Sequence, residues 1–328
     1  MRGLISLENY QQLKEWREEK IKSVSSDHYE LNRFHDVLMK KIVQIALKEV
    51  ESEWGKPPTH FAFFVMGSAG RSEQSVWSDQ DHGIVYDGEN VTFKDYFLKV
   101  GEEITKGFAV TGYEKCDGNV MASNPYWCKS TLQWEKQILE WLDEADWEAL
   151  RYFSTFFDSR VLVGDANILL NLKQVAFSKL AEIPSLYQRL YENVGYMKKG
   201  LGIFGQLLPE EKGIDAGTIN IKQTIFFPYV NSLRLLALLE KIPEASTLER
   251  FQRLSEEYKT IKKYQADFLK LLNYRLYFQK ETVSYQKVHL LQVKSMSSRE
   301  KASLKELIKN GRKLFKETKE IIDQRCSR

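Results

Sequence analysis

The chain has 328 residues, of which 43% are hydrophobic and 28% are charged, and its formal net charge is +3 at pH 7. This composition is typical of a globular protein, and the length is sufficient for two domains that each have a hydrophobic core. The sequence has no run of eighteen apolar residues, which argues against a membrane span, and its charge alone does not indicate nucleic-acid binding.

The first predicted elements are two helices within residues 7–53. Asp27 is suited to cap the start of the second helix, and apolar residues follow it at helical spacing: Leu31, Phe34, Leu38, Ile42, Ile45 and Ala46. Pro57 and Pro58 end this region, because proline cannot continue a helix. We therefore treat residues 1–58 as an N-terminal helical segment.

Two predicted strands, over residues 60–66 and 82–86, flank a polar turn. The first strand ends at Gly67-Ser68, and Asp79 and Asp81 come directly before the second strand. Residues two apart in an extended chain point to the same face, so both carboxylates should project together toward the turn. Glycine lets the backbone approach a phosphate, and paired carboxylates are hard oxygen ligands for Mg²⁺. The pattern predicts a site for a metal ion and a triphosphate.

The rest of the chain is predicted to be mostly helical. We expect a helix over residues 93–108, a short strand over 120–122, and helices from Leu132 almost to the end. The last segment, residues 298–325, combines an apolar stripe with many basic residues. Such a helix either binds a membrane or an acidic partner, or packs on a bundle with a solvated basic face, and packing is the commoner case.

The central motif resembles the signature of the DNA polymerase β-like nucleotidyltransferase superfamily. It reads Gly-Ser-Ala-Gly-Arg-Ser-Glu-Gln at residues 67–74 and Ser-Asp-Gln-Asp at residues 78–81. The chain is similar to the branch related to the PII-protein uridylyltransferase, whose domains often accompany CBS or cyclic-nucleotide-binding domains. Further similar segments extend over nearly the whole chain: residues 116–127, 156–160, 219–222 and 247–250.

This resemblance implies an α+β fold. A small mixed-sheet, polymerase β-like nucleotidyltransferase domain would occupy residues 59–165. The N-terminal helices would precede it, and a C-terminal helical bundle would follow over residues 166–328.

The resemblance also implies roles for individual residues. Asp79 and Asp81 would hold Mg²⁺ or Mn²⁺, and Gly67 and Ser68 would contact the phosphates of a nucleoside triphosphate. Arg71 would pair with a triphosphate oxygen. The alternative for Arg71 is a structural ion pair with Glu73 or Asp79.

A third carboxylate is not evident in the sequence. Polymerase β-like enzymes usually supply it from a neighbouring strand, but residues 120–122 contain no acid. Asp117 is the first candidate for this catalytic position, although a turn role in Asp117-Gly118 fits it equally well. Asp158 is the second candidate. Without a third carboxylate, nucleotide binding would remain while transfer would be weak or absent.

Two functions follow from these alternatives. One is a metal-dependent nucleotidyltransferase that moves a nucleoside monophosphate from a triphosphate to an acceptor, for which the resemblance implies a protein. A nucleic-acid acceptor is disfavoured, because the sequence shows no strong basic stripe. The helical domain, with Lys222, Arg234 and Arg250, would then select the acceptor. The alternative is a non-catalytic nucleotide-binding sensor or signalling module.

Three further features concern location and packing. Residues 1–8 lack the apolar core of a signal peptide, and the three cysteines are an odd set without metal-ligand spacing, so we expect free thiols in the cytoplasm. His82 should point to the strand face opposite Asp81 and play a structural role. Tyr126 and Trp127 either belong to the core or stack on a base.

Overall fold

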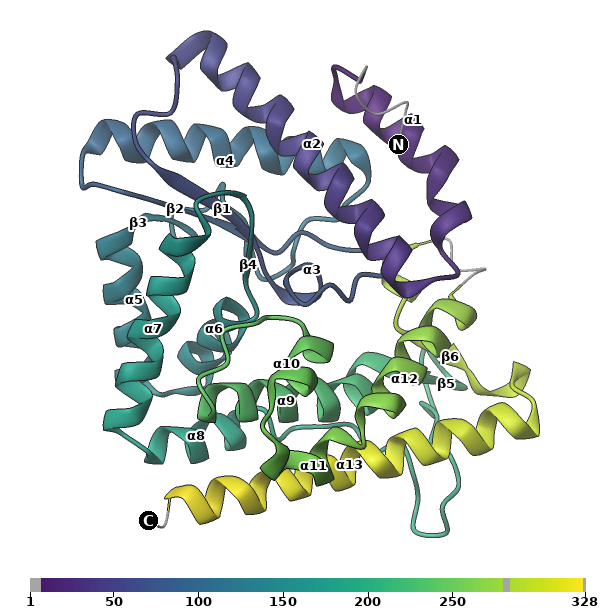
Figure 1. Cartoon of the computed structure of the whole chain (residues 1–328). Helices are drawn as coiled ribbons and strands as arrows, with labels where there is room; N and C mark the ends of the chain where they lie inside the picture. Colours follow the sequence, from purple (N-terminus) through teal and green to yellow (C-terminus); the bar gives the residue numbers. More distant parts are fainter. Residues whose placement is uncertain (1–6, 280–283, 327–328) are drawn as a thin grey trace. The chain divides into compact units, whose positions relative to one another are not determined.

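The computed structural model describes residues 7–279 and 284–326. The chain forms two compact units, one of residues 1–144 with residues 152–179 and one of residues 145–151 with residues 180–328. Figure 1 labels the elements of both units. Within the described ranges, no helix combines the length and the apolar character that a membrane crossing requires.

The first unit begins with the two helices that the sequence predicted, α1 (Tyr10–Val24) and α2 (His28–Trp54). Asp27 caps α2, because its carboxylate accepts a hydrogen bond from the Glu30 backbone N–H at 2.9 Å. The later helices up to residue 182 are α3 (Gly67–Gly70), α4 (Val91–Thr111), α5 (Thr131–Glu144), α6 (Trp147–Phe157) and α7 (Ala166–Glu182).

A four-stranded mixed sheet lies at the centre of this unit. In spatial order its strands are β3 (Cys128–Ser130), β2 (His82–Tyr86), β1 (Phe61–Val65) and β4 (Arg160–Gly164). Strand β1 runs antiparallel to β2 and β4, whereas β2 and β3 are parallel. Val65 pairs with both His82 and Arg160, so the end of β1 and the starts of β2 and β4 share one edge of the sheet.

Both faces of the sheet are covered, which explains why β1 is an uninterrupted apolar run rather than an alternating one. On one face the ring of Phe63 contacts Phe108 of α4. On the other face Phe64 contacts Trp134 of α5 and Phe156 of α6. Figure 1 shows α2 and α4 together on one side of the strands. Burying one such phenylalanine stabilises the fold by about 1.5–3 kcal/mol.

Most of the regular elements of the second unit are helices. Its helices are α8 (Ser185–Asn193), α9 (Phe227–Leu239), α10 (Thr247–Arg253), α11 (Lys259–Lys262), α12 (Gln265–Phe278) and α13 (Ser298–Cys326). A two-stranded antiparallel sheet joins β5 (Thr218–Asn220) to β6 (Leu290–Gln292). A π-helical turn (Lys222–Phe226) leads directly into α9, and Pro228 is the second residue of α9.

The basic C-terminal helix, α13, is docked within the second unit. Its predicted apolar stripe is buried, and Gly311 lies against the ring of Tyr229 in α9. The Tyr229 hydroxyl donates a hydrogen bond to the backbone oxygen of Leu307 at 2.9 Å. These contacts confirm the reading of α13 as a packed final helix rather than an unpartnered one.

The mixed sheet and the helical C-terminal region confirm the α+β class predicted from the sequence. One predicted element is wrong: residues 120–122 form no strand, and the third strand is Cys128–Ser130 instead. The side chain of His82 provides the reason. Its Nδ1 accepts the Ala122 backbone N–H at 3.1 Å, so this segment bends around an imidazole instead of pairing along a strand.

Candidate active site

The polar turn that follows β1 lies directly against Asp81. The Met66 backbone N–H donates to the Asp81 backbone oxygen at 2.8 Å, which ties the end of β1 to the residue before β2. Gly67 follows at φ +56, in the left-handed region that favours glycine. A Cβ at Gly67 would lie 2.3 Å from Oδ2 of Asp81. The absent side chain is therefore what lets this carboxylate reach the turn.

Asp79, Asp81 and Cys116 converge at this turn. Their potential ligand atoms, one carboxylate oxygen from each aspartate and the thiol sulfur, all lie within 4.8 Å of one another. Each of the three residues is half-buried, so the group is open to small solutes. Asp79 forms an isolated β-bridge with Glu114, and the Gln80 backbone N–H donates to the Glu114 oxygen at 2.9 Å. This pairing brings the segment that contains Cys116 beside the two aspartates.

A tight turn positions the Cys116 sulfur. The Asn119 backbone N–H donates to the Cys116 backbone oxygen at 2.9 Å, and Asn119 adopts φ +53. The amides of Gly118 and Val120 hydrogen-bond the sulfur, and the thiol also hydrogen-bonds Asp81. Burial, with a further contribution from the negative charge of Asp81, raises the pKa of the Cys116 thiol to about 12. Without a cation at the site, this thiol is therefore protonated at neutral pH.

The two candidates for a third carboxylate differ in their surroundings. The side chain of Asp117 is exposed and is not a member of the group formed by Asp79, Asp81 and Cys116. Asp158 is fully buried, and its carboxylate accepts a hydrogen bond from Nη1 of Arg71 at 2.7 Å. The structure brings Asp79 and Asp81 together, with the Cys116 thiol beside them, and the catalytic role of Asp117 stays a prediction.

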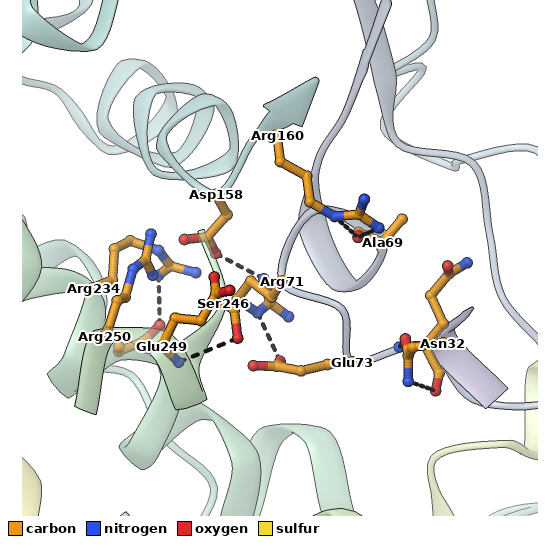
Figure 2. A network of polar contacts seen from close by, with 12 residues as sticks. Asn32, Ala69, Arg71, Glu73, Asp158, Arg160, Arg234, Ser246, Glu249 and Arg250 are labelled. Carbon is orange, nitrogen blue, oxygen red and sulfur yellow. Dashed lines mark hydrogen bonds and ion pairs between the residues drawn. The ribbon is translucent and has the colours of Figure 1, made fainter. Parts of the chain in front are cut away.

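Arg71 is held between two carboxylates. Its Nε donates to Glu73 at 2.8 Å while its Nη1 donates to Asp158, and Figure 2 shows the guanidinium between both acids. Burial alone would lower the pKa of Arg71, but the two adjacent carboxylates outweigh it and raise the pKa above its ordinary value. The sequence left open a structural ion pair of Arg71 with Glu73 or Asp79. The pair with Glu73 is present, and the second partner is Asp158.

Further hydrogen bonds fix the backbone of the turn. Nε and Nη2 of Arg160, at the start of β4, donate to the backbone oxygen of Ala69 at 3.1 and 2.9 Å (Figure 2). Asn32 of α2 accepts the Gln74 backbone N–H at 2.7 Å. The segment between β1 and β2 is therefore braced by one side chain from the sheet and one from a helix. Such bracing keeps the position of Gly67 and Ser68 well defined.

His82 and Trp127 belong to the core beside the site. The His82 imidazole is fully buried, and burial lowers its pKa to about 3. Since Nδ1 accepts from Ala122, the neutral ring carries its proton on Nε2, which lies 3.2 Å from Oε1 of Gln80. Trp127 is only 1% exposed, which makes it a core residue.

The donor atoms of this group fit a divalent metal ion. Asp79 and Asp81 supply hard oxygen ligands of the kind that Mg²⁺ and Mn²⁺ bind, and the missing Cβ of Gly67 leaves room beside Asp81. Cys116 is the member that the sequence did not reveal. Its neighbour Asp117 has the residue type expected for the family, and the turn geometry that selects between adjacent side chains has no marker in the sequence.

In the second unit, the basic residues proposed for acceptor selection differ in exposure. Arg250 is fully buried and its Nε donates to the backbone oxygen of Glu244 at 2.8 Å. Arg234 is 9% exposed and donates to Asn231 at 2.7 Å. Lys222 is half-buried. Of the three, Lys222 is the most accessible to a substrate.

Two family models match this chain. Residues 11–148 match the family described as "Putative nucleotidyltransferase DUF294", and residues 184–320 match the one described as "Putative nucleotidyltransferase substrate binding domain". Among curated proteins, none matches the chain significantly. The two matched segments follow each other along most of the sequence and include the turn, both aspartates and Cys116. The chain therefore belongs to the nucleotidyltransferase family that these two models describe.

Proposed function

We propose that this protein is a metal-dependent nucleotidyltransferase that moves a nucleoside monophosphate from a nucleoside triphosphate to a protein acceptor. The observation that carries the proposal is the convergence of Asp79 and Asp81 beside Gly67, where a side chain on residue 67 would collide with the Asp81 carboxylate. Asp79 and Asp81 would hold Mg²⁺ or Mn²⁺. When bound, the cation would neutralise phosphate charge and favour ionisation of the acceptor hydroxyl.

In the proposed reaction, an acceptor hydroxyl oxygen attacks the α-phosphorus. A new oxygen–phosphorus bond forms, and the bond between the α-phosphorus and the bridging oxygen breaks. Pyrophosphate departs with the electron pair of that bond, and the hydroxyl proton passes to solvent. The protein's own contribution is positioning and charge, because phosphoryl chemistry of this type requires little covalent help.

Gly67 and Ser68 are proposed to contact the β- and γ-phosphates. Both residues are half-buried and begin the short helix α3, where the first backbone N–H groups have no partner within the helix. Arg71 is proposed to act mainly by bracing this turn, because its guanidinium is already paired with Glu73 and Asp158. Its effect on nucleotide binding would then be exerted through the position of Gly67.

Recognition of the acceptor is proposed to involve the second unit. The support for this assignment is the match of residues 184–320 to a substrate-binding domain of the same family. Lys222 is the proposed contact, since it is half-buried, whereas Arg234 and Arg250 are buried within the unit. A protein acceptor follows only from the resemblance to the PII-protein uridylyltransferase.

A nucleotide-binding sensor is the second candidate function, and one specific observation favours it. The position beside Asp79 and Asp81 holds a thiol rather than a third carboxylate. A thiol is a poorer ligand for Mg²⁺ than a carboxylate. In this case the protein would bind a nucleoside triphosphate and release it unchanged.

The experiment that tests the proposal follows labelled nucleotide into the cell extract from which the acceptor would come. Purified protein, extract and each α-labelled triphosphate are incubated with Mg²⁺ or Mn²⁺, and the products are treated with protease or with nuclease. We expect label that protease releases and nuclease does not, and none with the Asp79→Asn, Asp81→Asn protein. Label in RNA or in a small molecule would contradict the protein acceptor. Binding without any transfer would favour the sensor.

A further inference from the structure

Cys116 is the third potential ligand next to Asp79 and Asp81. The sulfur and one oxygen of each aspartate lie within 4.8 Å of one another, a spacing at which one ion can contact all three. Carboxylate and thiolate together form a mixed hard and soft ligand set. Soft thiolate ligands favour Zn²⁺, whereas Mg²⁺ prefers oxygen ligands and retains its water.

Two backbone amides near the sulfur can stabilise it once a cation has displaced its proton. The backbone N–H groups of Gly118 and Val120 are directed at it, and hydrogen bonds from backbone amides stabilise a metal-bound sulfur. The hydrogen bond between the thiol and Asp81 places the sulfur and a second ligand side by side. Gly67 adds an independent feature, because its missing Cβ leaves the Asp81 carboxylate uncovered on the side of the turn.

We propose that Asp79, Asp81 and Cys116 form a binding site for a thiophilic divalent cation such as Zn²⁺, with Cys116 as the residue that selects it over Mg²⁺. The proposal rests on the proposed function, since it assigns the metal preference of the same site. On binding, a zinc–sulfur bond forms and the sulfur–hydrogen bond breaks, and the proton passes to solvent. Zn²⁺ then competes with Mg²⁺ and inhibits nucleotide transfer that depends on Mg²⁺.

The test uses Co²⁺ as a spectroscopic substitute for Zn²⁺ on the full-length protein. Cobalt bound to a thiolate gives a sulfur-to-metal charge-transfer absorption that carboxylate ligands cannot produce. We expect this absorption in the unmodified protein, its loss in Cys116→Ser, and its displacement by added Zn²⁺. Zinc affinity, measured by competition with a chromophoric chelator, should fall at least about tenfold in Cys116→Ser.

A matched control separates Cys116 from the other thiols. Cys326 in α13 is half-buried like Cys116, so Cys326→Ser should retain the absorption. Cys116→Asp should lose the absorption and bind Mg²⁺ more tightly than the unmodified protein, because it supplies a third carboxylate. Circular dichroism checks that each variant is folded. Calorimetry in buffers of different ionisation enthalpy should show more proton release on zinc binding for the unmodified protein than for Cys116→Ser.

The outcomes distinguish this proposal from the proposed function. An absent absorption, or one that persists in Cys116→Ser, overturns the role of Cys116 even if nucleotide transfer with Mg²⁺ is observed. An absorption that requires Cys116, in a protein that transfers no nucleotide, supports the zinc site and overturns the enzymatic function. Unchanged zinc affinity in Cys116→Ser also overturns the proposal.

Discussion

The residue on which the site depends most is Gly67, since two separate constraints act on it. Its φ of +56 disfavours any side chain, and a Cβ would lie 2.3 Å from the Asp81 carboxylate. The positive φ affects the stability of the fold, whereas the close approach affects the position of the Asp81 carboxylate as a metal ligand. A substitution at Gly67 should therefore affect the site more than a similar substitution at a glycine with open surroundings.

We predict that Gly67→Ala weakens metal binding by at least about tenfold, because Asp81 or the turn must move. The backbone strain should cost about 1–2 kcal/mol of stability. Gly55→Ala is the matched control, since Gly55 has φ +79 and a Cβ there meets nothing within 4 Å. Calorimetric titration with Mn²⁺ and thermal unfolding measure both effects. Equal metal affinity in the two variants would show that Gly67 does not govern the position of Asp81.

The aspartates could be predicted from the sequence, whereas the third member of the group could not. Asp79 and Asp81 precede an apolar strand with a spacing that places both carboxylates on one face. Asp117 and Cys116 are neighbours, and only the turn that ends at Asn119, with its φ of +53, determines which of them faces the aspartates. That choice depends on the conformation of the turn and on its hydrogen bonds to the sulfur, which leave no periodic pattern in the sequence.

At the scale of elements, the central strands were predictable because burial on both faces produces continuous apolar runs. The predicted strand over residues 120–122 was wrong because a side chain, His82, competes for the backbone of that segment. The His82 N–H donates to the Val120 oxygen at 3.0 Å, and the imidazole accepts from Ala122. His82 thus hydrogen-bonds this segment through both its backbone N–H and its imidazole ring. The same ring should make the first unit sensitive to acid.

Burial lowers the pKa of His82 to about 3, below the ordinary value of 6.5. Between these values the unfolded chain binds a proton at this residue that the folded chain does not, so stability falls as the pH is lowered from 6.5. We predict that the unmodified protein loses about 2 kcal/mol more stability between about pH 7.5 and about pH 5 than His82→Gln does. His35, whose pKa burial also lowers to about 3, remains in both proteins.

Urea unfolding followed by circular dichroism at the two pH values measures this difference. His60→Gln is the control, because it makes the same substitution at an exposed histidine. An equal loss of stability in His82→Gln and in the unmodified protein would contradict the assignment of a neutral, buried ring to His82.

Helix α13 owes its position to a close approach at Gly311. A Cβ there would lie 2.7 Å from the Tyr229 ring and 3.2 Å from Pro228. We predict that Gly311→Val destabilises the second unit by about 1–3 kcal/mol, because the added atoms overpack the contact with α9. Ala302→Val, on the exposed face of α13, should cost under about 0.7 kcal/mol, the helix-propensity difference. Chemical denaturation measures the free energy of unfolding of both variants. An equal loss in Gly311→Val and Ala302→Val would mean that α13 can move away from α9 without loss of stability.

At the scale of the whole molecule, the candidate site and the second family match lie in different units. The first contains the turn, the paired aspartates and Cys116, and the second corresponds to the substrate-binding model of the family. The fold class was predicted from the resemblance of the central motif to the polymerase β-like superfamily, and the helical spacing of apolar residues after Leu132 agreed with it. The boundaries at residues 58 and 165 stay a prediction. The compact units are not continuous in sequence, because residues 145–151 belong to the second unit although residues 152–179 after them belong to the first.

The measurement that tests the central claim most directly compares triphosphates labelled at the α- and γ-phosphates. A nucleotidyltransferase attaches the α-phosphate to its acceptor and releases the γ-phosphate within pyrophosphate. We predict covalent incorporation of α-label and none of γ-label, only with Mg²⁺ or Mn²⁺, and loss of incorporation by at least about 100-fold in the Asp79→Asn, Asp81→Asn protein. Incorporation of γ-label, or α-label incorporation that survives loss of both aspartates, would contradict the account.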